Sequence, residues 1–109
     1  MVTIRQLLDT KGHEVFALAP DASVFDAIEL MAARGVGALL VLEHGRIVGI
    51  VSERDYARKV ILRGRSSRTT AVGDIMSAPV ITAPSRLTVE EGMAIMTERR
   101  IRHLPIVDD

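Results

Sequence analysis

The chain has 109 residues, enough for one compact domain or for two very small units that share a core. Its composition, 48% hydrophobic and 26% charged, is typical of a soluble globular protein, and the 3% of aromatic residues argues against a stacking surface for single-stranded nucleic acid. The 14 Lys and Arg balance the 14 Asp and Glu, which excludes a strong overall attraction to nucleic acid or anionic membranes, and the absence of cysteine excludes disulfides, thiolate metal sites and cysteine nucleophiles.

The N-terminus "MVTIRQLLDTKGHEV" lacks the apolar core of a signal peptide. No apolar run approaches the ~20 residues that a membrane-spanning helix needs. The sequence therefore predicts a cytoplasmic location.

The first half of the chain predicts helices and strands in alternation. "TIRQLL" favours a short helix, and "VFALAP" a short strand. Residues 23–34 predict a helix that begins at Ser23 and ends at Gly35. "ALLVLE" and "RIVGIV", joined by "HG", predict a β-hairpin.

A second helix should follow the hairpin. "SERDYARKVIL" predicts it, with Tyr56, Ala57, Val60 and Ile61 on one face. The polar and basic "RGRSSRTT" predicts a linker, and "AVGDIM" a short helix that leads into the second half.

The second half repeats the plan of the first with a shift of 65 residues. Positions 24, 31, 34 and 39 carry the same residues as positions 89, 96, 99 and 104. We therefore predict a first repeat over residues 1–65 and a second over 66–109. The second copy stops at Asp109, where the first begins its hairpin turn, so the expected strand Leu104–Val107 would have an unpaired edge, and we expect that the protein continues beyond Asp109.

A hydroxyl residue followed three positions later by an acid occurs three times, as Ser23/Asp26, Ser52/Asp55 and Thr88/Glu91. This spacing is that of a helix capping box. Ser52 differs because it directly follows a predicted buried strand, where backbone N–H groups at a helix start face the crevice beside the strand ends. There Asp55 could accept hydrogen bonds from the two hydroxyls of a ribose, while Ser52 could hold a phosphate. From spacing alone, capping and ligand binding both stay open for this pair.

Three stretches carry a family resemblance: "GRIVGIVSERDYARKV", "DIMSAPVITAP" and "RRIRHLPIVDD". Together with the duplication, they make nearly the whole chain resemble the cystathionine beta-synthase (CBS) domain pair, or Bateman module, of the bacterial stand-alone type. The resemblance implies an α/β fold in which two strand-helix-strand-strand-helix repeats pack about a pseudo-two-fold axis, the second being incomplete here. It also implies pairing as a homodimer and an adenosyl ligand (AMP, ADP, ATP, NAD or S-adenosylmethionine) as regulatory effector between the repeats, with no metal.

The same resemblance assigns roles to residues of this chain. Asp55 would take the ribose hydroxyls, Ser52 would lie beside it near ribose or phosphate, and Arg102 would reach a phosphate. His103 and Pro105 would lie on the cleft wall, and the apolar neighbours of the adenine would be Ile50, Met76 and Val80. The first repeat departs from this pattern, since it has Gly37 where the second has Arg102 and Leu40 where the second has Pro105.

Other polar residues give weaker signals. The basic residues 58, 59, 63, 65 and 68 could bind nucleic acid or a phosphate, but without interleaved aromatics a solvated surface is the favoured interpretation. Lys59, one helical turn after Asp55, is the member best placed to reach a ligand. The three histidines, His13, His44 and His103, are too scattered for a metal site.

No set of residues indicates catalysis, because Ser52 has no histidine at a spacing that suggests a base and the acids are accounted for by helix starts. Met31, Met93 and Met96 lie at helical spacing and are predicted core residues. The sequence predicts a regulatory module rather than an enzyme, which senses an adenine nucleotide and signals to an unidentified effector protein. A ligand-free dimerisation module is the alternative, and nucleic-acid binding through the basic linker is a weaker one.

Overall fold

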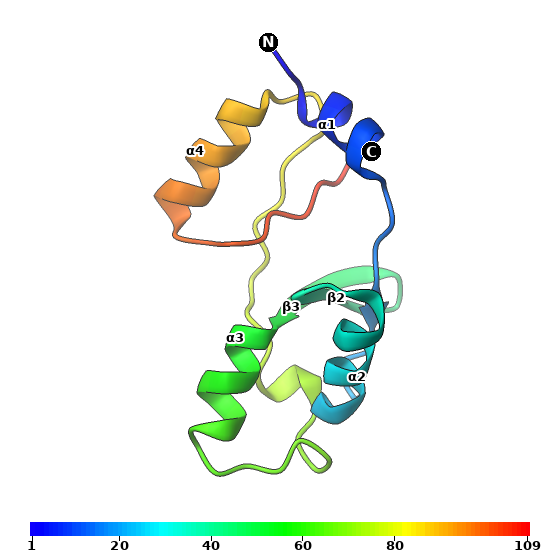
Figure 1. Ribbon diagram of the computed structural model, residues 1–109, viewed down its shortest axis with the longest axis vertical. Coiled ribbons are helices and arrows are strands. Elements are labelled where there is room, and N and C mark those ends of the chain that lie inside the picture. Colours follow the sequence, from blue (N-terminus) through cyan, green and yellow to red (C-terminus); the bar gives the residue numbers. More distant parts are fainter. The chain divides into compact units, whose positions relative to one another are not determined.

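The computed structural model describes residues 1–109, which form two compact units (Figure 1). The insert unit comprises residues 15–80, and the outer unit comprises residues 1–14 together with 81–109. The N-terminal segment thus packs with the second half of the chain. The insert unit extends past the predicted boundary between the repeats, which lies between residues 65 and 66. That division of the sequence into repeats stays a prediction. None of the helices combines the length and the apolar content that a membrane span requires.

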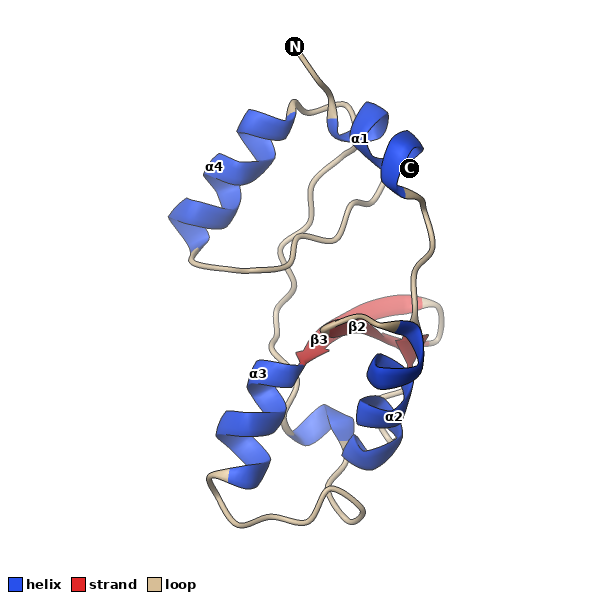
Figure 2. Ribbon diagram, in the orientation of Figure 1, coloured by secondary structure: helices blue, strands red, loops and turns tan.

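The insert unit carries a three-stranded sheet and the helices that cover it (Figure 2). Its elements in chain order are β1 (Ala17–Leu18), α2 (Val24–Arg34), β2 (Ala38–Glu43), β3 (Arg46–Ser52), α3 (Glu53–Tyr56), the π-helical η1 (Ala57–Ile61) and the 3-10 helical η2 (Val72–Asp74). β1 pairs in parallel with β2, and β2 pairs in antiparallel fashion with β3. This order confirms the predicted strand-helix-strand-strand-helix unit.

Local sequence signals account for the start and end of these elements. Ser23 begins α2, since its hydroxyl accepts the Asp26 N–H at 3.0 Å. Gly35 ends α2 in the left-handed conformation, with φ 65°, which glycine adopts without strain. His44 and Gly45 both have positive φ, as a tight two-residue hairpin turn requires, so the predicted hairpin is confirmed.

The core of the insert unit lies between the sheet and its helices. Its buried side chains are Val24, Ala27 and Met31 of α2, Leu39 and Val41 of β2, Val51 of β3, Val60 of η1, and Val72 and Ile75 in and after η2. The predicted apolar face of the second helix is only partly right, because Val60 is buried whereas Ala57 and Ile61 are exposed. Residues 57–61 wind as a π-helix, with Leu62 N–H bonded to Ala57 O, and this wider turn changes which side chains face the core.

The outer unit is built on two helices, α1 (Ile4–Lys11) and α4 (Val89–Arg99). Each begins with a reciprocal capping box, and the α4 box joins Thr88 and Glu91 as predicted. Backbone hydrogen bonds tie the two helix starts together, among them Ile4 N–H to Leu87 O at 2.8 Å. Ile4 is buried where α1 approaches Gly92 so closely that a Cβ there would lie 3.0 Å from the Ile4 Cδ1.

Two predictions for the second half are wrong. Residues 104–107 do not form a strand: one parallel bridge joins Ile106 to Ala83, because this segment has no antiparallel neighbour like β3. Met93 is not a core residue, since 61% of its surface is exposed, whereas Met31 is buried and Met96 half-buried. α4 has no sheet to pack on within the outer unit, so its apolar face is covered only in part.

Candidate functional site

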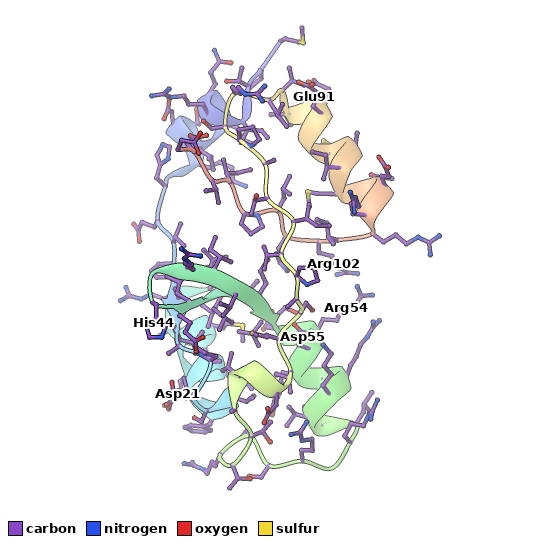
Figure 3. The ribbon with its side chains drawn as sticks, turned by 180° about the vertical axis from the view of Figure 1, so that it is seen from behind. Asp21, His44, Arg54, Asp55, Glu91 and Arg102 are labelled. Atoms are coloured by element: carbon purple, nitrogen blue, oxygen red, sulfur yellow. The ribbon has the colours of Figure 1, made fainter.

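The candidate site lies where β3 gives way to α3 in the insert unit. β3 ends at Ser52, which is also the N-cap of α3, and Asp55 lies in the first turn of that helix. Ser52 is 9% exposed and Asp55 8%. In Figure 3, Asp55 lies at the start of α3 and Glu91 at the corresponding position of α4. Asp55 is buried whereas Glu91 is exposed, so equal spacing in the sequence produces two different environments.

Ser52 and Asp55 form a reciprocal capping box with one bond more than the pattern requires. The Asp55 N–H donates to Ser52 Oγ at 3.2 Å, and the Ser52 N–H donates to Asp55 Oδ2 at 3.0 Å. The Ser52 hydroxyl also donates to the same Oδ2 at 3.0 Å. These bonds fix the rotamer of Asp55 and aim its second oxygen, Oδ1, away from the cap.

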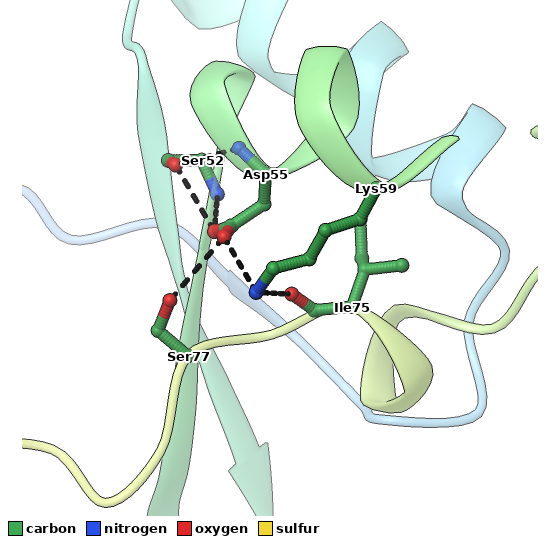
Figure 4. Close-up of polar contacts among 5 residues, drawn as sticks. All are labelled: Ser52, Asp55, Lys59, Ile75 and Ser77. Atoms are coloured by element: carbon green, nitrogen blue, oxygen red, sulfur yellow. Dashed lines mark hydrogen bonds and ion pairs between the residues drawn. The ribbon is translucent and has the colours of Figure 1, made fainter. Parts of the chain in front are cut away.

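Oδ1 of Asp55 meets two groups from other parts of the insert unit (Figure 4). Lys59 Nζ lies 3.0 Å from it, and the Ser77 hydroxyl donates to it at 3.3 Å. Lys59 also donates to the backbone carbonyl of Ile75 at 2.8 Å. The carboxylate therefore connects α3 to the segment that follows η2. Capping of a helix does not require such a connection.

The Asp55 carboxylate is saturated with donors. A carboxylate has about four lone-pair positions. Two donors from Ser52 approach Oδ2, and one each from Lys59 and Ser77 approaches Oδ1. An additional hydroxyl can bind this carboxylate only if one of these donors moves.

The three predicted apolar neighbours also belong to the insert unit. Ile50 of β3 exchanges two backbone hydrogen bonds with Ser77, of 3.0 and 2.8 Å, which holds the segment after η2 against the sheet. Met76 consequently lies beside Gly49, where a Cβ would overlap its Sδ and approach its Cγ to 2.8 Å. Val80 is half-buried at the end of the unit. Ile50 and Met76 thus flank the residues that contact Asp55.

The other predicted ligand residues belong to the outer unit. Arg102 and His103 are exposed, and Pro105 is half-buried. The Pro105 carbonyl accepts a hydrogen bond from the Ala83 N–H at 3.1 Å. A joint site of these three residues with Asp55 stays a prediction.

Sequence reasoning missed Ser77 and the Ile75 carbonyl. Ser77 is far from Asp55 in sequence, so no helical or strand periodicity links them, and a backbone carbonyl leaves no trace in the residue type. The only signal was indirect, because Ser77 lies within "DIMSAPVITAP", one of the stretches that carry the family resemblance.

Part of the basic stretch has partners within the chain. The Arg68 guanidinium lies 3.9 Å from the centre of the Phe25 ring, and Arg65 lies 3.9 Å from an oxygen of Asp74. No group of three or more His, Cys, Asp or Glu side chains is placed to hold a metal ion.

Comparison with known proteins gives consistent results. The family model of the CBS domain matches residues 1–62 and 72–109. The chain is 40% identical to the mitochondrial CBS domain-containing protein CBSX3 of Arabidopsis thaliana, over 98% of this chain and 56% of the relative, so it spans little more than half of that protein.

Solved structures agree with this result. A CBS-domain protein of Burkholderia ambifaria, to which a role in signal transduction has been attributed, superposes with a TM-score of 0.93 at 46% identity, over 98% of this chain and 81% of that one. The CBS domain pair of the protein MJ0100, solved with 5′-methylthioadenosine and S-adenosyl-L-methionine, superposes with a TM-score of 0.77 at 25% identity, over 87% of this chain and 76% of that one.

Proposed function

The chain belongs to the CBS domain family, and on this premise we propose that it is a regulatory module that binds an adenosyl compound and transmits binding as a conformational change. The observation that carries the proposal is the buried Asp55 carboxylate, oriented by Ser52 at the end of β3. Its geometry suits a pair of neighbouring hydroxyls, because the two carboxylate oxygens can each accept one of them. In this proposal, Asp55 binds the ribose.

The adenosyl class is supported by the ligands of the MJ0100 pair, both of which contain an adenosine ribose. In this chain Ile50, Met76 and Val80 would contact the adenine. Arg102 would reach a phosphate, with His103 and Pro105 beside it. The candidate effectors are AMP, ADP, ATP, NAD and S-adenosylmethionine.

The signal would come from unequal affinity for two arrangements of the module. A ligand that binds one arrangement more tightly shifts the population toward it, by no more than that difference in affinity. We propose that the change is passed to a partner protein, without catalysis in this chain, and that the module pairs as a homodimer. The cytoplasmic location also stays a prediction.

The saturation of Asp55 favours one alternative. If the network serves only to hold α3 against the segment after η2, the chain is a ligand-free interaction module. The basic stretch gives less support to nucleic-acid binding, because Arg65 and Arg68 already have partners within the chain.

Thermal unfolding tests the proposal. The midpoint is measured with each of the five adenosyl compounds, for the natural chain and for Asp55→Ala. A ligand at 100 times its dissociation constant stabilises the native state by about 2.7 kcal/mol. The matched control is Glu91→Ala, which removes the acid of a capping box of the same pattern from the exposed start of α4.

We expect at least one compound to raise the midpoint of the natural chain and of Glu91→Ala, and to leave Asp55→Ala unchanged. If none of the five compounds has an effect on the folded natural chain, the interaction module replaces the sensor. If Asp55→Ala responds as strongly as the control, Asp55 does not hold the ribose.

A further inference from the structure

We propose that one exposed face of the helix formed by α3 and η1 is a docking surface for an acidic amphipathic helix of a partner protein. This face, the Arg/Leu face, consists of Ala57, Arg58, Ile61, Leu62 and Arg63. The inference rests on the proposed function, since it supposes that the module acts on a partner protein. It adds the surface that the partner uses and the chemistry that the partner presents.

The first observation is that the Arg/Leu face exposes large apolar side chains to water. Leu62 is 77% exposed and Ile61 55%. The insert unit has one other exposed large apolar side chain, Val15, at its first residue. Single exposed apolar residues are common on protein surfaces, whereas adjoining ones favour contact with another molecule. The pair at residues 61 and 62 therefore marks a place where a partner can bury apolar surface.

The second observation is the winding of the helix. α3 and η1 form one continuous coil (Figure 1), in which residues 57–61 wind as a π-helix. The wider turn directs Ala57 and Ile61 outward, while Val60 stays buried. The spacing of a regular α-helix would place all three on one face. π-Helical turns are rare and are frequent at functional sites, and this one exposes an isoleucine that a regular helix would cover.

The third observation is the charge around the apolar pair. Residues 57–65 hold four basic side chains and no acid. Arg58 and Arg63 are exposed and form no ion pair within the chain. A guanidinium group can bind a carboxylate with two parallel hydrogen bonds, and arginine is enriched in protein interfaces. The Arg/Leu face therefore fits a partner that offers carboxylates beside apolar side chains.

The same charges argue against two other occupants. A second copy that used the same face would bring Arg58 and Arg63 against their counterparts, and like charges across an interface cost free energy. A lipid surface attracts a protein from a distance through net positive charge, but this chain has 14 basic and 14 acidic residues. Arg58, Ile61 and Leu62 lie three and four positions apart, a spacing that matches the side chains of a facing helix.

Fluorescence anisotropy with a synthetic peptide tests the inference. The probe is a labelled peptide of about 18 residues, long enough to be helical in water, with leucine and glutamate along one face and alanine elsewhere. The control peptide has lysine in place of glutamate. The test variants of the full chain are Leu62→Ser and Arg58→Gln. Val15→Ser and Arg46→Gln are the matched controls, because they remove the same kinds of group from exposed residues outside the Arg/Leu face. Thermal unfolding verifies that each variant is folded.

We expect the acidic peptide to bind the natural chain and the lysine peptide not to bind it. Leu62→Ser should weaken the acidic peptide about tenfold, as for the loss of one buried leucine. Arg58→Gln should weaken it about fivefold and make its binding less sensitive to salt, because one charge-assisted contact is lost. Val15→Ser and Arg46→Gln should leave the affinity unchanged.

Four results would overturn the inference. The acidic peptide does not bind the folded natural chain, or all four variants bind it equally. Alternatively, sedimentation shows that Leu62→Ser and Arg58→Gln separate subunits of the chain alone, and the Arg/Leu face then belongs to a second copy. In the fourth case, the chain binds vesicles of phosphatidylglycerol through Leu62 and does not bind the peptide, which assigns the face to a lipid surface.

The two proposals fail separately. None of these measurements uses an adenosyl compound, so each result leaves the binding of an adenosyl ligand in place. If none of the five adenosyl compounds acts on the folded chain, the sensor fails, and the affinity of the chain for the acidic peptide is unaffected.

Discussion

Replacement of Asp55 should cost more stability than the loss of an exposed helix cap. In Asp55→Ala the Ser52 N–H loses its acceptor within a residue that is 9% exposed, and a buried donor left without a partner costs about 1–3 kcal/mol. This lost bond is also the Asp55 half of the capping box, and the other half, from the Asp55 N–H to Ser52 Oγ, remains in the variant. Loss of the half-exposed Lys59 pair adds about 0.5 kcal/mol. We expect a total of about 2.5 kcal/mol.

Chemical denaturation measures this loss of unfolding free energy, and a thermal scan should show the midpoint of Asp55→Ala lower by about 10 °C or more. The comparison variant is Glu91→Ala, whose carboxylate accepts the Thr88 N–H at 3.0 Å but is exposed to water. We expect a clearly smaller loss for it, because water replaces the missing acceptor. Equal losses in the two variants would refute the reasoning, since Asp55 would then act only as a helix cap and its contacts with Lys59 and Ser77 would contribute nothing.

Two further predictions concern the surroundings of the site and the outer unit. Gly49→Ala should destabilise the protein by about 1–3 kcal/mol and weaken the binding of an adenosyl ligand, because the new Cβ displaces Met76. Gly37→Ala should cost less stability, because its Cβ meets only the flexible end of an exposed glutamate side chain. Unfolding and ligand titration of both variants check this prediction, and equal losses of stability would contradict it. The hydrogen bonds from the Ser85 hydroxyl and N–H hold the pKa of Asp108 below its usual 3.8. The stability that these bonds contribute is therefore complete above pH 3.8, and it is lost as the pH falls through the lower pKa of Asp108 in the folded state. Ser85→Ala should therefore lose less stability on acidification than the natural chain in a series of unfolding midpoints that spans pH 3.8, and identical slopes would exclude this contribution.

Short-range signals predicted most of the insert unit. The hydroxyl at Ser23, Gly35 in the left-handed conformation and the turn at His44 act within a few residues, so the sequence pattern was sufficient for them. The junction of β3 and α3 was predicted in the same way, from the position of Ser52 after an apolar run.

Long-range packing accounts for what was missed. Ser77 reaches Asp55 only because the segment after η2 is bonded to Ile50, and no local pattern contains that pairing. Residues 104–107 have the composition of a strand, but a strand also needs neighbours, and the outer unit supplies one bridge. Helical spacing predicts that Met93 lies in the core, but spacing identifies a face of the helix and not what covers that face, and Met93 is exposed.

The order of the two units along the chain links their stabilities. The outer unit consists of two segments that are joined only through the insert unit, so its folding has to close a loop made of residues 15–80. When the insert unit is folded, a chain of pairs across the sheet links Ala17 to Leu40, Leu40 to Ile50 and Ile50 to Ser77. Three strand spacings, about 15 Å, therefore separate Ala17 from Ser77, which lie near the entry and the exit of this loop.

An unfolded insert unit is instead a long flexible loop, and closure of such a loop costs about 0.6 kcal/mol more for each doubling of its length. The entropy of closure therefore couples the two units even without a contact between them. A compound that stabilises the insert unit alone would also stabilise the pairing of α1 with α4, and the chain itself would carry part of the signal.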